Sequence, residues 1–502
     1  MSDRDPSRPA RAPGALVGRV AVDRRALAAL RVALGLLLVA DLALRARALG
    51  AHYTDRGVLP RTALRETYGP LADLSLHALS GGFALQVALF GLAAVAALAL
   101  AAGYRTRLAA VVSWLLLVSL HARNPLLLNA GDSLLRRLLF WGLFLPLGGV
   151  WSVDAVGRVG EDGADGSRGA GSVAGVATAA LLVQVVILYV VNAVIKLRGG
   201  AWLDGTAVRY VFGIDHLTLW LGGVLAGQGP LLSALGHVWL GLLVLSPLLL
   251  VVRGWPRALL AAALGAGHLG MAPTLRLGPF AFVSMAALLP FLPSVVWDAA
   301  GRRVRAVVPA ERRTRVGRAA RGLAARLPRG PEPSLGDDLR TAARRVAAVV
   351  AAVLLVTVLA WNAVSVGAAP APAEVRDVSR EYRWDMFAPE PRRVDGWYVA
   401  PATLPSGERV DAWNGGAVSW APPPDTAATF PTHRWLVYLL DLRRPGGAEL
   451  RDEFGAYLCR RTAARHGTTP LNVSVTYVER PVRLDGPTET RRVGLGTYRC
   501  RA

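Results

Sequence analysis

The residue most able to carry chemistry in this chain is its only lysine. Lysine and arginine together number 57, and Lys196 alone is a lysine. An amine can give up its proton when it is desolvated, whereas a guanidinium group stays protonated. Because every other basic position uses arginine, Lys196 is a candidate general base. The alternative is an interfacial anchor, whose ammonium reaches from the end of a membrane helix toward water.

Further polar side chains are predicted to lie at the same membrane level as Lys196. His237 and His268 fall within apolar runs, and Arg276 follows the second of them. The connection between two earlier runs adds another polar group, formed by His121, Asn124, Asn129 and Asp132. Ionisable groups inside a membrane usually face the bundle interior or a wet cavity. A shared outer cavity and separate hydrogen bonds between helices are both compatible with this pattern.

Other chemical signals in the sequence are weaker. Asp41 lies in the first apolar run with Arg45 one helical turn further on, and an i,i+4 ion pair accounts for both. The sequence contains no P-loop, GxSxG, HExxH or dinucleotide-binding motif. Metal, serine-hydrolase and nucleotide chemistry are therefore not indicated.

The elements that would position these residues are membrane helices. Of 502 residues, 53% are hydrophobic and 18% are charged, whereas soluble domains carry about 25% charged residues. A hydrocarbon core of ~30 Å requires about 20 apolar residues in a helix. The sequence predicts an all-α multi-pass transmembrane bundle with about nine spans, near residues 26–45, 82–102, 106–122, 134–150, 174–196, 231–252, 257–276, 279–297 and 346–366. A weaker apolar stretch, 206–226, contains Arg209, Asp215 and His216 and is predicted to be re-entrant or interfacial.

The distribution of arginine predicts the orientation in the cell membrane. Thirteen arginines lie between Arg302 and Arg345, in a chain of net charge +22. Such clusters mark the cytoplasmic side and contact anionic lipids. They lack interleaved aromatic residues that would stack on bases, so nucleic acid is not an expected partner. We expect a cytoplasmic segment at 1–25, a transmembrane domain at 26–300, a basic cytoplasmic loop at 301–345, a last transmembrane helix at 346–367 and an extracytoplasmic domain at 368–502.

Residues 368–502 are predicted to form a small α+β domain tethered by the Ala/Pro-rich stretch near 368–373. Alternation at 397–399 and 472–478 is typical of strands, residues 405–407 of a turn, and residues 447–466 of an amphipathic helix. The two cysteines of the chain, Cys459 and Cys500, both fall here. In an oxidising compartment they are expected to pair. Two buried free thiols are the alternative.

Several stretches resemble the HTTM-domain membrane proteins, the bacterial relatives of vitamin K-dependent gamma-carboxylase. They are RVALGL at 31–36 with Asp41, YTDRGVLP at 53–60, WSVD at 151–154, AVIKL at 193–197 with WLDG at 202–205, and GHLGM at 267–271 ahead of Phe280 and Trp297. The resemblance covers about residues 20–300. In addition, WDMFAPEP at 384–391 looks like the tail found on many bacterial members.

The resemblance implies that Lys196 deprotonates a reduced naphthoquinone of the menaquinone or vitamin K type, whose oxygenated form then acts as a strong base on the substrate. It implies that His268 and Asn129 act as catalytic residues beside Lys196. Trp202, His237 and Arg276 are the candidates for holding the cofactor. The implied partner is a secreted or membrane-bound peptide. The alternative is a non-enzymatic assembly or export factor for a secreted peptide or toxin.

Overall fold

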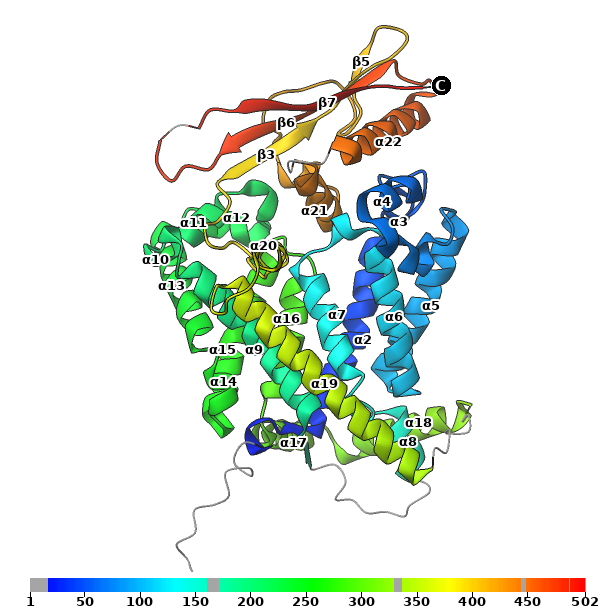
Figure 1. Ribbon diagram of the computed structural model, residues 1–502, viewed down its shortest axis with the longest axis vertical. Coiled ribbons are helices and arrows are strands. Elements are labelled where there is room, and N and C mark those ends of the chain that lie inside the picture. The colour runs from blue at the N-terminus through cyan, green and yellow to red at the C-terminus, as the bar shows by residue number, and fades with distance from the viewer. Residues whose placement is uncertain (1–16, 160–170, 329–335, 444–447, 487, 502) are drawn as a thin grey trace, which may run out of the picture.

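A computed structural model of the protein describes residues 17–159, 171–328, 336–443, 448–486 and 488–501. Long helices run side by side, and a sheet-containing domain covers one end of them (Figure 1). In the described part, six helical stretches are long and apolar enough to cross a membrane. They comprise α2 (Arg24–Ala46), α5 (Phe83–Ala102), α6 (Thr106–Arg123), α9 (Val176–Lys196), α13 with α14 (Gly229–Leu245 and Leu248–Val251), and α19 (Asp337–Ser365).

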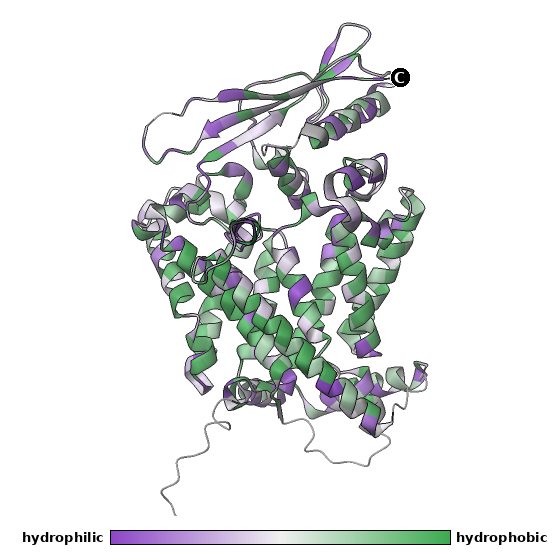
Figure 2. Cartoon of the chain, in the orientation of Figure 1, coloured by the Kyte–Doolittle hydropathy of each residue, from purple (hydrophilic) through white to green (hydrophobic). Residues whose placement is uncertain are grey.

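The burial of these helices indicates which ones would face lipid. In its most apolar window, α9 is 72% buried, whereas the corresponding stretch of α19 is only 6% buried. On α19, Val349, Val353 and Val356 are about 60% exposed or more. The helices form a hydrophobic band, and polar residues gather at both ends (Figure 2). An apolar surface of this extent needs a covering of lipid, as a multi-pass membrane protein has.

The helices differ from the predicted spans in two places. The span expected at 134–150 is α7 (Ala130–Gly142), whose 13 residues reach only about 20 Å, because Pro146, Gly148 and Gly149 follow in a turn. The span expected at 279–297 comprises α16 (Phe280–Leu288) and η6 (Leu289–Phe291), and it bends by 103° into α17 (Ser294–Val307). Pro290 and Pro293 stand at this break and interrupt helical hydrogen bonding.

The remaining predicted span, at 257–276, is α15 (Gly254–Thr274), a 21-residue helix. It is not among the six apolar stretches, since Arg257, His268 and Pro273 lower its hydropathy. The described residues thus contain six such stretches, or seven if α16–α17 counts as one. The total of about nine spans remains a prediction.

Short elements gather at the two ends of the bundle. The weak stretch 206–226 is broken into α11 (Ala207–Phe212), η5 (Asp215–Leu217) and α12 (Trp220–Ala226), so it is not a straight span. These elements lie beneath the sheet domain with α3 (Leu49–Tyr53), α4 (Arg61–Tyr68) and α10 (Gly200–Leu203). At the opposite end lie α8 (Val153–Val159), α17 and α18 (Ala310–Arg326) (Figure 1). The basic helices and the sheet domain are therefore at opposite ends, as the predicted orientation requires.

The C-terminal domain has the predicted α+β composition. Its antiparallel sheet consists of β3 (Val394–Val399), β4 (Pro401–Thr403), β5 (Arg409–Asp411), β6 (Asn472–Pro481) and β7 (Arg491–Arg499). The long strand β6 is central, because it pairs with β7 on one side and with β3 and β4 on the other. Both runs with predicted alternation, 397–399 and 472–478, are strands, and 405–407 forms the β4–β5 turn.

Helices pack beside this sheet. The predicted helix is α22 (Ala448–His466); residue 447 lies outside the described part. Sequence reasoning missed α20 (Ala373–Glu381) and α21 (His433–Leu442). The predicted disulfide is confirmed: Cys459 on α22 is bonded to Cys500 after β7, with Cα atoms 5.6 Å apart.

The C-terminal domain is packed against the bundle as well as tethered to it. One continuous cluster of buried apolar residues includes Leu42 and Phe90 of the bundle together with Trp435, Phe454 and Val473 of the C-terminal domain. Helix α21 lies at the contact between them (Figure 1). A shared core of this kind gives the domain a fixed position over the end of the bundle.

Candidate functional site

Lys196 is the last residue of α9 and is buried, with 2% of its surface exposed. Its Nζ donates a hydrogen bond to the carbonyl of Met386 (2.8 Å) and lies 3.5 Å from the carbonyl of Phe387. The ring of Trp202 lies 3.7 Å from Nζ. The indole N–H of Trp202 also donates to the Phe387 carbonyl, at 2.8 Å. Two donors from the bundle therefore converge on one peptide carbonyl.

That carbonyl belongs to residues 384–390, here called the 384–390 segment, which lies between α20 and β3. Phe387 has φ of 54°, a left-handed conformation that a bulky residue adopts only when its surroundings hold it. Ala388 packs against Ile187, Val191 and Ile195 of α9.

The far end of the 384–390 segment contacts the loop after α9. The Glu390 carboxylate accepts a hydrogen bond from the N–H of Ala201 at 3.3 Å. The carbonyl oxygen of Pro389 fills the space that a side chain at Gly199 would need. The segment thus lies directly over the end of α9.

His268, the second predicted catalytic residue, lies deeper in the bundle on α15 and is 1% exposed. Its Nε2 is 3.1 Å from the hydroxyl of Tyr189, and its Nδ1 has no hydrogen-bond partner among the described residues. Tyr189 lies on α9, two turns before Lys196 and on the same face.

A row of aromatic rings joins His268 to the 384–390 segment. The His268 ring is 5.1 Å from that of Trp239 and 5.5 Å from that of Phe280. Phe280 in turn lies 5.8 Å from Trp384. These spacings are typical of packed aromatic pairs. His268 is thus flanked by the rings of Trp239 and Phe280, and Phe280 connects it to Trp384 of the segment.

The other predicted site residues lie elsewhere. Asn129 caps α7 and its side-chain amide is 2.6 Å from Nε2 of His433. His237 is exposed and bonds the carbonyl of Leu203. Arg276 donates to two carbonyls of the C-terminal domain, those of Ala427 and Phe430. Within the described ranges, no hydrogen bond links these three residues to Lys196.

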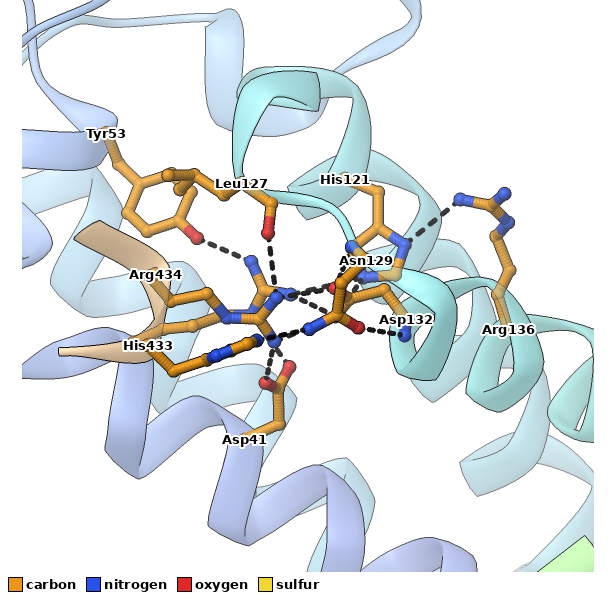
Figure 3. A network of polar contacts seen from close by, with 10 residues as sticks. Asp41, Tyr53, His121, Leu127, Asn129, Asp132, Arg136, His433 and Arg434 are labelled. Carbon is orange, nitrogen blue, oxygen red and sulfur yellow. Dashed lines mark hydrogen bonds and ion pairs between the residues drawn. The ribbon is translucent and has the colours of Figure 1, made fainter. Parts of the chain in front are cut away.

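A second constellation, here called the charge cluster, consists of Asp41, Arg45, Asp132 and Arg434; Figure 3 labels Asp41, Asp132 and Arg434. Arg45 bonds Asp41 at 2.7 Å and Asp132 at 2.5 Å. Arg434 bonds the same two carboxylates, each at 2.5 Å. All four side chains are at most 4% exposed. The result is a closed ring of two carboxylates and two guanidinium groups with no net charge.

Neutral polar groups surround the charge cluster. Tyr53 accepts a hydrogen bond from Arg45 at 2.7 Å, and the carbonyl of Leu127 accepts one from Arg434 at 2.8 Å. His121 lies between Arg45 and Arg136, with its ring nitrogens 3.5 Å and 3.1 Å away (Figure 3). Additional acceptors of this kind make a buried ion pair tolerable, because every remaining donor must be satisfied.

The charge cluster joins parts that are far apart in the chain. Asp41 and Arg45 come from α2 and Asp132 from α7, whereas Arg434 comes from α21 of the C-terminal domain. The predicted pair Asp41–Arg45 is present. The contribution of Arg434 was missed, because a contact across 393 residues leaves no local pattern in the sequence.

The charge cluster could be mistaken for a metal site. Ligand atoms of Asp41, His121 and Asp132 lie within 4.8 Å of one another. However, both carboxylates are already bonded by two guanidinium groups, and a further cation would be repelled by both. We therefore interpret the charge cluster as the junction between the bundle and the C-terminal domain.

A second polar junction lies at the η5 end of the bundle. Nδ1 of His216 is 2.6 Å from the carboxylate of Asp395 on β3, and Arg480 contacts both Asp395 and Asp215. Burial alone would raise the pKa of Asp395. Hydrogen bonds from His216 and Arg480 outweigh that effect and leave the pKa below its usual value. Asp395 is therefore a carboxylate at neutral pH.

An open cleft of about 460 Å³ lies along the same seam between bundle and domain. Its lining includes the aromatic side chains of Phe83, Trp435 and Tyr457 together with Arg47 and Arg461. No carboxylate is among its lining residues. The aromatic side chains could contact an apolar body, and Arg47 and Arg461 could bind an anionic group of the same molecule.

When compared with known protein families, curated proteins and solved structures, the chain gives no match. The resemblance to HTTM-domain proteins therefore depends on the quoted stretches alone.

Proposed function

We propose that this protein is a multi-pass membrane enzyme in which Lys196 acts as a base toward a reduced naphthoquinone from the bilayer. The observation that carries the proposal is the environment of Nζ. Lys196 is buried at the end of a membrane-type helix, and in the described structure no carboxylate forms an ion pair with it. A lysine amine in such surroundings is able to exchange a proton, which none of the chain's arginines can do.

The residues around Lys196 include the aromatic and polar side chains that a bound quinone would need. The rings of Trp239 and Phe280 flank His268, and flat aromatic molecules pack favourably on such rings. Two polar groups are available for the two oxygens of a quinone, Lys196 and the Tyr189–His268 pair, and Tyr189 lies on the same face of α9 as Lys196. When bound, a reduced naphthoquinone supplies an acidic hydroxyl group and a ring that reacts with oxygen.

The chain's own side chains then have separate roles. Nζ of Lys196 accepts the proton, and the Trp202 ring fixes the position of the amine. The Tyr189 hydroxyl orients His268, whose unpartnered Nδ1 is free to bond an oxygen of the ligand. The C-terminal domain presents a secreted or membrane-bound peptide, and the basic surface of α17 and α18 contacts anionic lipids.

A specific observation favours a second candidate, a non-enzymatic assembly or export factor. Nζ of Lys196 bonds carbonyls of the 384–390 segment, so the lysine also ties α9 to the region that leads into the C-terminal domain. An anchor needs only a positive charge and a long stem, and arginine provides both.

The substitution Lys196→Arg tests whether Lys196 acts as a base or as an anchor. Lys196→Arg retains the charge but removes the exchangeable amine, so enzyme activity should fall by about 10²–10⁴-fold. The matched control is the double variant Lys196→Arg/Arg198→Lys, which keeps one lysine but moves it by two residues. Oxygen consumption with added menadiol is the readout, alongside protein abundance and melting temperature in detergent. A stable Lys196→Arg protein with full activity would show that Lys196 is not the base, whereas a folded parent that consumes no oxygen with menadiol would favour the assembly factor.

A further inference from the structure

The site around Lys196 is closed by a part of the same chain. Lys196 and Trp202 are 2% and 4% exposed, and the 384–390 segment covers both. The donors that meet there, the amine of Lys196 and the indole N–H of Trp202, converge on the Phe387 carbonyl. Two convergent donors are the arrangement that recognises a carbonyl or enolate oxygen. Here the oxygen that they bind is the protein's own.

The 384–390 segment combines apolar packing of Ala388 and Trp384 with carbonyl contacts to Lys196 and Trp202 that a ligand oxygen could replace. It lies outside helices and strands. Its internal support includes a backbone hydrogen bond from Ala388 to the carbonyl of Asp385. The neighbouring Tyr382 is 70% exposed, and Asp385, Pro389 and Glu390 are exposed as well. One side of the segment thus faces solvent, while the other fills the site.

We propose that the 384–390 segment is an internal ligand of the Lys196–Trp202 site, which withdraws to admit a molecule bearing a carbonyl or enolate oxygen. The segment holds the two donors through its own peptide oxygens when no such molecule is bound. This inference rests on the proposed function, since it describes how the same site opens. It adds that the C-terminal region controls access to the lysine.

The single lysine makes the proposal directly measurable. An amine-reactive acylating reagent labels Lys196 only when the segment has moved away, and peptide mass spectrometry locates the label. The lysine introduced by Arg409→Lys, at an exposed position of β5, serves as the accessible reference in every protein. In the parent, Lys196 should react slowly and at least tenfold slower than that reference.

Two adjacent glycines provide a matched pair of variants. A Cβ at Gly199 would overlap the carbonyl oxygen of Pro389, whereas a Cβ at Gly200 would lie 3.8 Å from Glu390, an ordinary contact. Gly199→Ala should therefore displace the segment and speed labelling of Lys196 at least tenfold. Gly200→Ala should label as slowly as the parent. The intact Cys459–Cys500 disulfide and a single cooperative melting transition show that each variant is folded.

A second pair covers the case in which Gly199→Ala fails to fold. Trp202→Phe keeps an aromatic ring beside Nζ but removes the indole donor to the Phe387 carbonyl, and should speed labelling by roughly three- to tenfold. Trp413→Phe removes an equivalent donor, 2.9 Å from the carbonyl of Thr429 inside the C-terminal domain, and should leave labelling unchanged. Equal labelling in both members of each folded pair would overturn the proposal, as would a Lys196 that stays unlabelled until the protein unfolds.

Adding menadiol separates this proposal from the proposed function. If both hold, menadiol protects Lys196 of the Gly199→Ala variant from the reagent. If labelling rises in that variant but menadiol gives no protection, the segment still closes the site and the quinone assignment fails. If Lys196→Arg abolishes activity while no variant changes labelling, the base assignment stands and the internal-ligand proposal fails.

Discussion

Arg434 balances charges that the membrane bundle cannot balance alone. Without it, the carboxylates of Asp41 and Asp132 would share the single guanidinium of Arg45. Removing one partner from a buried ion pair typically costs 3–5 kcal/mol, because the other charge stays buried without compensation. The charge cluster therefore makes the stability of the bundle depend on one residue of the C-terminal domain.

Arg434→Met should lower the free energy of unfolding by about 3–5 kcal/mol, as measured by denaturation in detergent. A second substitution, Asp132→Asn, should recover part of this loss, because it removes the surplus negative charge; the two changes should be strongly non-additive. The control is Arg460→Met. Arg460 is exposed and donates to the carbonyls of Arg56 and Gly57 across the same seam, so its loss should cost less than about 1 kcal/mol. Equal losses at Arg434 and Arg460 would contradict the role of the charge cluster.

Residue-scale prediction succeeded where the signal was local. The pair Asp41–Arg45 follows from helical spacing, and the importance of Lys196 follows from its being the only lysine. The sequence predicted that Asn129 would act beside Lys196. In the described structure its side-chain amide instead contacts His433, 304 residues further along the chain. Arg434 and the 384–390 segment reach their positions through tertiary contacts, which no spacing rule reveals.

At the scale of elements, the length of each apolar run predicted the helices, and prolines accompany the predicted spans that end early or bend. The runs that became α2, α5, α6 and α9 begin and end within about two residues of the predicted bounds. The spans that ended early or bent are those followed or interrupted by Pro146, Pro290 and Pro293. Helix α21 was missed because ten residues are a short run in a region of strand-like alternation. Yet α21 is the element that carries both His433 and Arg434 into the junction.

The contact of α21 with the bundle should weaken in acid. Burial, together with the positive charge of Arg434, lowers the pKa of His433 to about 3. A histidine whose folded pKa lies below its unfolded value of about 6.5 favours the folded state above pH 6.5. That contribution is lost as pH falls from 6.5 toward 3, by at most tenfold in the folding equilibrium per pH unit.

His433→Asn should flatten this pH dependence, since an amide oxygen can still accept from Asn129 but does not titrate. Melting temperatures of both proteins between pH 4 and pH 8 provide the measurement. Parallel curves for parent and variant would mean that His433 is not the titrating group. Other acid-sensitive groups, such as Asp395, would affect both proteins equally.

At the scale of the whole molecule, the two ends of the bundle differ in chemistry. The arginine-rich α17 and α18 lie at one end and the disulfide-bonded domain at the other (Figure 1). Positive loops are retained in the cytoplasm, while disulfides persist in oxidising compartments. Both signals predict the same orientation, with the sheet domain outside the cell membrane.

The orientation can be tested with single cysteines, because the described chain has no free thiol. Ser406→Cys, in the exposed β4–β5 turn, should react with a membrane-impermeant maleimide on intact cells. Arg318→Cys, on α18, should react only after the cells are permeabilised. The opposite pattern would place the C-terminal domain in the cytoplasm and would overturn the assignment.

The late position of Arg434 in the chain also affects the order in which the charge cluster forms during synthesis. A ribosome releases Asp41, Arg45 and Asp132 early, and the partner that completes their ring emerges about 300 to 400 residues later, since 393 positions separate Asp41 from Arg434. Until then the nascent bundle holds one negative charge too many. The charge cluster is therefore completed only after Arg434 has been synthesised. A chain truncated before residue 434 would carry this unbalanced charge, a defect by which quality-control proteases could distinguish incomplete copies from finished ones.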